Sequence, residues 1–132
     1  MKKREMQSEE DIQELVYAFY GKIRQNELLS PIFNSIIPVD DWDIHLSKMI
    51  RFWSTMLLYT RSYSGDPMSK HFALPIGEEH FLIWLKLFHE TVDELFTGKI
   101  AEDAKLRANG IGRIMASNLG VSPDSEIYER KF

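Results

Sequence analysis

The chain has no cysteine among its 132 residues, which excludes several kinds of chemistry. Without thiols there is no disulfide, no thiolate nucleophile, no zinc–thiolate centre and no C-x-x-C-H attachment of a haem group. Long apolar runs are also absent, and since a membrane-spanning helix needs about 20 consecutive apolar residues, none is expected. The first residues, MKKREMQSEED, carry basic side chains but no apolar run behind them, so they do not resemble a signal peptide. We therefore expect a cytoplasmic protein with no membrane partner.

A strong excess of one charge is lacking too. The formal net charge is −4, and acidic and basic residues are interspersed, so no basic face for nucleic acid is predicted. Repeats and low-complexity runs are absent, and the length corresponds to one domain. Apolar residues make up 44% of the chain and aromatic residues 12%, enough for one ring-rich core. We expect a single domain over residues 1–132, with its core at about 11–119 and a frayed tail at 120–132.

Apolar residues at helical spacing predict two long helices in the first half of the chain. The first begins after Ser8, which forms a capping-box pattern with Asp11, and its apolar stripe follows in steps of three and four residues. The second is predicted from Asp40, with Asp43 as its capping partner, to about residue 59.

Two further long helices are predicted in the second half. One covers about residues 78–96 and is closed by Gly98, and the other covers about 101–119. No segment of the chain alternates with period two, so the predicted fold class is all-α.

Two segments contain prolines that interrupt this pattern. NELLSPIFNSIIP is interpreted as a loop with a short turn. In SGDPMSKHFALP, Asp66 as N-cap and Pro67 at the first helical position predict a short helix that carries His71 and ends before Pro75. Because a proline restricts the backbone on each side, His71 is presented with little conformational freedom to lose.

The four histidines are the main candidates for metal chemistry. None has a glutamate three positions before it, as di-iron bundles require, and none forms an H-x-x-x-H or HExxH pattern. His80 and His89 flank acidic residues on the third long helix and are expected to be solvated. His45 lies in an apolar stripe between Trp42 and Met49, where a core histidine bonded to a carbonyl is the simplest interpretation.

A single imidazole among many aromatic residues fits best with axial ligation of haem, a large flat cofactor. Haem needs a crevice lined by rings and by Leu or Met, for which the chain offers Phe33, Phe52, Phe81, Trp84 and Met115. From periodicity alone, ordinary core packing is the better explanation of these residues. Tyr20, at the edge of the first stripe, is either a surface tyrosine or a hydrogen-bond donor into such a crevice. Enzyme motifs such as G-x-S-x-G and the P-loop are absent.

Six short motifs occur in order along the chain and cover roughly residues 11–119. They are FY (Phe19, Tyr20), PIF (Phe33), W..H (Trp42, His45), FW..ML (Phe52, Trp53), Y.G.P...H (Tyr63 to His71) and IWLKLF (Trp84). This ordered set resembles the truncated haemoglobins, specifically the third group of these short bacterial globins. The glycine motifs typical of the first two groups are absent, as expected for the third.

The resemblance implies a two-over-two helical sandwich that holds non-covalent haem b with its iron. It implies that His71 is the proximal iron ligand and that Tyr20 and Trp84 are distal hydrogen-bond donors. His45 matches a residue of the distal helix that can gate the pocket. The remaining matched positions are implied to contact the haem face (Phe33) or its propionates (Lys48, Tyr63 and Lys70).

For function, the resemblance implies binding of O₂, NO or other small ligands. We expect redox chemistry on NO or reactive oxygen, as an NO dioxygenase or a peroxidase-like enzyme with an external reductase, and not O₂ transport. Two alternatives stay open: a haem-based sensor or carrier that acts through a partner, and a haem-free helical interaction module. The joint presence of Tyr20, His45, His71 and Trp84 argues against the last of these.

Overall fold

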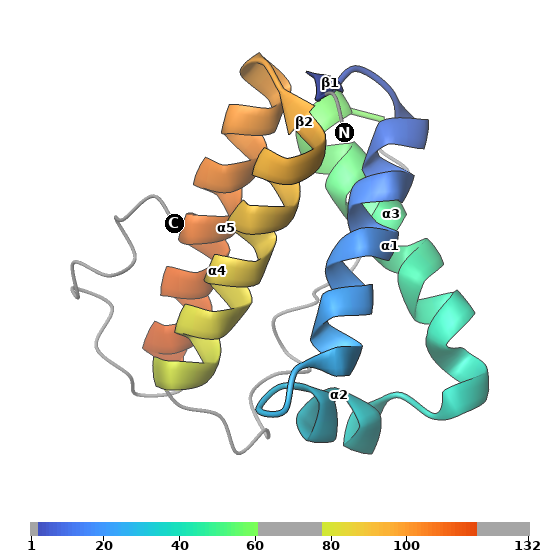
Figure 1. The fold of residues 1–132 in the computed structure, drawn as a ribbon, viewed down its shortest axis with the longest axis vertical. Coiled ribbons are helices and arrows are strands. Elements are labelled where there is room, and N and C mark those ends of the chain that lie inside the picture. The colour runs from blue at the N-terminus through green and yellow to red at the C-terminus, as the bar shows by residue number, and fades with distance from the viewer. Residues whose placement is uncertain (1–2, 61–77, 119–132) are drawn as a thin grey trace.

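The computed structural model describes residues 3–60 and 78–118, which form two pairs of helices (Figure 1). The elements in chain order are β1 (Arg4–Glu5), α1 (Glu9–Gln25), α2 (Ser30–Ile36), the 3₁₀ turn η1 (Val39–Asp41), α3 (Trp42–Leu58), α4 (Glu78–Leu95), β2 (Phe96–Thr97) and α5 (Lys99–Asn118). Helix α1 packs against α3 and against α4, and α4 packs against α5. The predicted all-α fold class and two-over-two arrangement are confirmed.

Helix α1 begins where the sequence predicts. Its N-cap is Ser8, and the Asp11 carboxylate turns back to accept hydrogen bonds from the backbone N–H groups of Ser8 (3.2 Å) and Gln7 (2.9 Å). These bonds satisfy donors that the first turn of a helix cannot pair internally. Acidic residues occupy the first turn, and Lys22 and Arg24 occupy the last turn, which suits the helix dipole at both ends.

Two predictions about helix starts were wrong. Residues 30–36 are a helix and not a loop, because Pro31 stands in the first turn, where its missing N–H costs no hydrogen bond. Helix α3 begins at Trp42, and Asp40 lies in the preceding 3₁₀ turn, so the predicted Asp40–Asp43 capping box is not formed.

The strands β1 and β2 were not predicted. They pair in parallel over two residues each, and the Met6 N–H continues the pairing to the Thr97 carbonyl at 3.1 Å. Two residues are too few for a period-two pattern to appear in the sequence. The pair ties the N-terminal segment to the turn between α4 and α5, where Gly98 has a φ of +100° (Figure 1).

Aromatic rings join the two helix pairs in the core. Phe88 of α4 stacks on Trp53 of α3, with ring centroids 4.8 Å apart, and meets the Phe19 ring of α1 edge-on at 5.1 Å. Phe19 and Phe88 are each 1% exposed. Within residues 3–60 and 78–118, no helix is both long and apolar enough to cross a membrane.

Candidate functional site

A cluster of rings forms where the C-terminal half of α1 crosses the start of α3. Tyr20 meets the imidazole of His45 edge-on, with ring centroids 5.0 Å apart. The Trp42 ring lies 6.2 Å from Tyr20 and 5.7 Å from His45, also edge-on, and Phe33 of α2 lies 6.1 Å from Tyr20. The structure therefore brings three of the predicted site residues, Tyr20, Phe33 and His45, into one cluster.

The Tyr20 side chain places a buried hydroxyl in this cluster. It is 6% exposed, and burial raises the pKa of its hydroxyl well above the usual range. The hydroxyl therefore keeps its proton at any physiological pH. A protonated hydroxyl can donate a hydrogen bond, as the distal role predicted for Tyr20 requires.

Trp84 lies on α4 and contacts the residue of α1 that precedes Tyr20. Its ring meets Phe19 edge-on at 5.7 Å and stacks on Phe88 at 6.0 Å. Phe19 and Tyr20 are neighbours in α1, so one turn of this helix contacts Trp84 of α4 through Phe19 and His45 of α3 through Tyr20. The half-buried Trp84 indole is a second donor and stands on a different helix from Tyr20.

Helices α2, α3, α4 and α5 all carry half-buried apolar side chains. They pack on the core but keep part of their surface exposed, and they include Phe33, Met49, Phe52, Met56, Ile83, Trp84, Leu87 and Ile111. A large apolar cofactor binds between helices by covering such side chains. The predicted contacts Phe33, Phe52 and Trp84 belong to this set, whereas Phe81 lies deeper in the core, at 3% exposed.

Trp42 contributes a buried donor to the same region. Its side chain is 3% exposed, and the indole Nε1 has no hydrogen-bond partner in the part of the chain that the structure describes. An unpaired buried donor is costly, by about 1–3 kcal/mol. Together with the half-buried rings, this unpaired donor gives a region whose contacts the described residues leave incomplete, and the residues present fit a flat apolar group such as haem.

Several predicted site residues lie outside the described residues. They are His71, Tyr63 and Lys70, together with the side chain of Met115. Lys48 is placed on α3, half-buried. The described residues contain no group of three or more His, Asp or Glu side chains that could hold a metal ion. The assignment of His71 as the iron ligand stays a prediction.

One prediction about the histidines was wrong. His89 is 1% exposed and not solvated, and its Nε2 lies 2.8 Å from Asn109 Oδ1 of α5. Burial, the largest influence, lowers the pKa of His89, and the contact with Asn109 opposes this only in part. His80 is half-buried near the start of α4.

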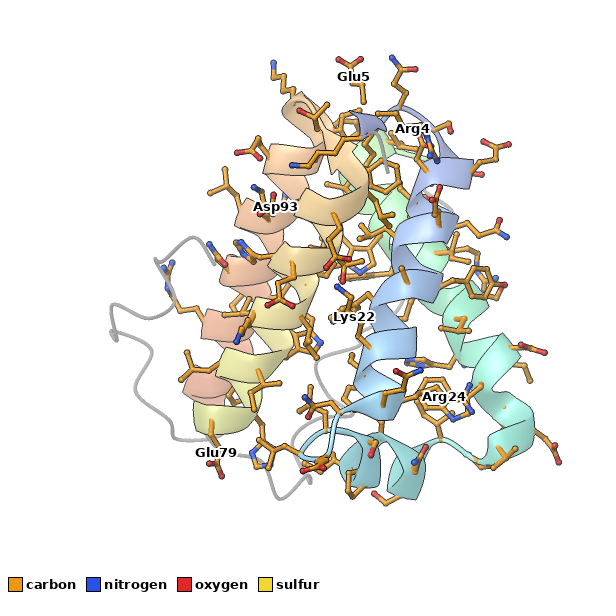
Figure 2. All side chains as sticks on the ribbon, viewed as in Figure 1. Arg4, Glu5, Lys22, Arg24, Glu79 and Asp93 are labelled. Carbon is orange, nitrogen blue, oxygen red and sulfur yellow. The ribbon has the colours of Figure 1, made fainter. Side chains whose placement is uncertain are left out.

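Arg24 was not among the predicted site residues. Its guanidinium carbon lies 4.5 Å from the centroid of the Trp42 ring, and Figure 2 shows the side chain directed from the end of α1 toward the start of α3. The signal in the sequence is spacing, because Arg24 follows Tyr20 by four residues and therefore shares its face of the helix. Its partner Trp42 is distant in sequence, so the contact itself was not predictable.

Comparison with known proteins agrees with this geometry. Residues 5–113 match the model of the family described as bacterial-like globin. The chain is 38% identical over 107 residues to the group 3 truncated hemoglobin ctb of Campylobacter jejuni, and the match covers 79% of this chain and 84% of that protein. The crystal structure of the group III truncated hemoglobin from Campylobacter jejuni superposes with a TM-score of 0.83 at 36% identity, covering 89% of this chain and 95% of the other.

Haem with its iron is the cofactor of globins, and small gaseous ligands such as O₂ are what they bind. The family match extends from β1 into α5 and so includes Tyr20, His45 and Trp84. The chain belongs to the bacterial-like globin family and, within it, to the group III truncated haemoglobins.

Proposed function

We propose that this globin holds non-covalent haem b through His71 and uses its distal side for redox chemistry on NO or reactive oxygen. The observation that carries the proposal is the buried Tyr20 hydroxyl beside the His45 imidazole, with Trp84 of α4 in edge contact with the neighbouring Phe19 ring. The haem iron, when bound, supplies the ligand-binding and electron-transfer centre. The chain supplies the groups around it.

Binding of the cofactor rests on apolar contacts, two lysine cations and one tyrosine hydroxyl. The half-buried rings of Phe33 and Phe52 are suited to cover a porphyrin face, and we assign Phe81 and Met115 to the same wall. Lys48 and Lys70, with Tyr63, are proposed to hold the propionates, because ammonium and hydroxyl groups pair with carboxylates. Without cysteine, the cofactor has no thioether attachment to the chain.

The distal donors decide how long a ligand stays. Tyr20 and Trp84 each donate one hydrogen bond to a negatively polarised ligand atom, and in a dry pocket each bond contributes about 1–3 kcal/mol. Two such bonds slow O₂ release by roughly 10²-fold or more, since 1.4 kcal/mol is a factor of ten. A protein that releases O₂ this slowly is a poor carrier. It is better suited to keep O₂ for reaction with NO or to polarise a peroxide bond, with electrons from an external reductase.

Two measurements test the proposal in sequence. The first is the absorption spectrum and haem affinity of the wild type and of His71→Ala. Loss of the wild-type Soret band in the variant is expected, and an unchanged band with unchanged affinity would contradict the assignment of His71.

The second measurement is stopped-flow O₂ dissociation from the wild type, Tyr20→Phe, Trp84→Phe and the double variant. We expect each single change to speed release about tenfold or more and the double change to speed it further. Tyr17→Phe is the matched control, because Tyr17 is 48% exposed on α1 and faces away from the core. If the wild type releases O₂ as fast as the double variant, the redox proposal loses its basis and a carrier becomes the better interpretation.

A further inference from the structure

Four side chains interlock where α1 crosses the start of α3. Tyr20 and Arg24 stand one turn apart on α1, and Trp42 and His45 stand one turn apart on α3. The rings of Tyr20, Trp42 and His45 meet edge-on in all three pairings, at centroid distances between 5.0 and 6.2 Å. Arg24 covers the Trp42 ring with its guanidinium, 4.5 Å from the centroid (Figure 2).

Among the described residues, ring contacts and the Arg24 cation are what hold the Trp42 side chain in this cluster. Its indole Nε1 has no hydrogen-bond partner within the described residues, so no hydrogen bond there fixes the orientation of the ring. The contacts that orient it are the edges of Tyr20 and His45 on one side and the cation of Arg24 on another. A ring with no such anchor depends more than usual on each remaining contact.

We infer that Arg24 is a positioning residue for the distal side: through Trp42 it holds His45 against Tyr20 and so limits how often the pocket opens. The inference rests on the proposed function, in which His45 gates ligand access. His45 cannot leave Tyr20 without losing its edge contact with Trp42 or moving the indole as well. The indole is 3% exposed, and removing Arg24 would uncover the ring and free it to follow His45.

The expected size of the effect follows from the contact. An arginine over a tryptophan at a solvent-exposed position shifts the equilibrium between the closed and open positions of His45 by about two- to fivefold. Arg24→Gln removes the charge and keeps most of the length, so ligand association should become two- to fivefold faster. Arg24→Lys keeps a cation but loses the planar group that stacks on the indole, so it should restore the wild-type rate only in part.

The test is the rate of CO association with the reduced haem protein after flash photolysis, together with the infrared CO stretch. Wild type, Arg24→Gln, Arg24→Lys and Lys22→Met are compared. Lys22 is the matched control, because it is a cation of the same helix turn that pairs with Glu94 of α4, 2.9 Å away, and not with the Trp42 cluster. We expect a faster rate and a second CO band in Arg24→Gln, and neither in Lys22→Met.

A merely structural role of Arg24 would give a different pattern. In that case the melting temperature would fall while the CO band and the association rate stayed at their wild-type values, which would overturn the inference. The same change is therefore made in His45→Leu, where Arg24→Gln should no longer alter the rate. An undiminished effect in that background would show that Arg24 does not act through His45 and would also overturn the inference.

The haem-free protein gives an independent result. The ring protons of His45 lie next to two aromatic rings, so their NMR shifts report how tightly the imidazole is held. We expect these shifts to move toward random-coil values in Arg24→Gln, and unmoved shifts would count against the inference. Failure of the proposed function is distinguishable from failure of this inference. The proposed function fails if O₂ release does not change in the Tyr20 and Trp84 variants, whereas the role of Arg24 is tested separately by the CO association rates and the NMR shifts.

Discussion

The two ends of α1 differ in how well their polar groups are hydrogen-bonded. At the N-terminal end, Asp11 accepts hydrogen bonds from two backbone N–H groups and from Arg4, and Arg4 also pairs with Glu14 and covers the Phe96 ring at 5.0 Å. At the C-terminal end, the buried indole N–H of Trp42 has no hydrogen-bond partner among the described residues, and its ring contacts those of Tyr20 and His45.

The difference separates an end that is fully bonded from the end at which we propose that the cofactor and ligand bind. Burial alone would raise the pKa of the Asp11 carboxyl, but the hydrogen bonds from Gln7, Arg4 and Ser8 outweigh it and hold the pKa below its usual value. That end therefore stabilises the fold without needing anything further. Around Tyr20, by contrast, the indole N–H of Trp42 has no partner among the described residues, and half-buried apolar side chains pack on the core, which suits the binding of an apolar cofactor.

The largest expected effect comes from a residue that serves both ends. Phe88 stacks on Trp53 and contacts Phe19 and Trp84, so Phe88→Ala removes the ring that joins the two helix pairs. We expect a loss of about 3–5 kcal/mol in the free energy of unfolding, measured by urea denaturation, because a buried ring is replaced by a cavity. Haem affinity should fall in parallel. A variant that kept its stability but lost haem affinity would show that Phe88 does not couple the two ends of α1, contrary to what its ring contacts indicate.

A smaller loss is expected where only the fully bonded end is disturbed. Gly98 has a φ of +100°, and a Cβ added there would lie 2.7 Å from Cγ of Glu5. Gly98→Ala should cost about 1–3 kcal/mol, because alanine is strained in that conformation. The ligand side should be untouched, so O₂ release should keep its wild-type rate. Gly110→Ala is the control, because a Cβ there meets nothing within 4 Å and should be tolerated.

A change at the helix-capping residue Asp11 tests the same difference between the two ends of α1. Asp11→Ala removes the side-chain acceptor at the start of α1 and should destabilise the protein by about 1 kcal/mol, with no change in O₂ release. Thermal unfolding is compared with that of Glu10→Ala, which removes an acid from the same turn. Similar losses in the two variants would mean that the helix dipole, and not the capping bonds, is what matters at this end.

The smallest effect is the pH dependence of stability that comes from the buried contact of His89 with Asn109. Because the pKa of His89 is lowered in the folded state, the unfolded chain binds its proton first as pH falls. The stability contributed by neutral His89 should be complete above its ordinary pKa of 6.5 and should decrease as the pH falls below it. The charges that act on His89 from nearby are Lys105, which lowers its pKa, and Asp93, which raises it.

The measurement is the free energy of unfolding between pH 7.5 and pH 5 for the wild type and His89→Gln. The wild type should lose stability over this range, and the variant should lose less of it. Equal slopes would place the titration on another histidine.

Much of the fold was open to prediction because its signals are local. The start of α1 follows from Ser8 and Asp11, three residues apart, and the end of α4 from Gly98, with an error of one residue. The start of α3 was misjudged because Asp40 and Asp41 both look like caps, and the choice between them depends on how the chain leaves Pro38. Pro31 was ambiguous in the same way, since a proline can interrupt a helix or begin one.

The features of the site likewise divide into those that local sequence predicts and those that depend on tertiary packing. The sequence by itself determined which residue types are available: no thiol, one histidine within the α3 stripe, and aromatic side chains at helical spacing on α1, α3 and α4. Only the tertiary structure decided that Arg24 meets Trp42, that Tyr20 meets His45, and that His89 is buried against Asn109. The physical reason is range: caps and stripes depend on residues within a turn or two, whereas these contacts form only when α1 packs on α3 and α4 packs on α5.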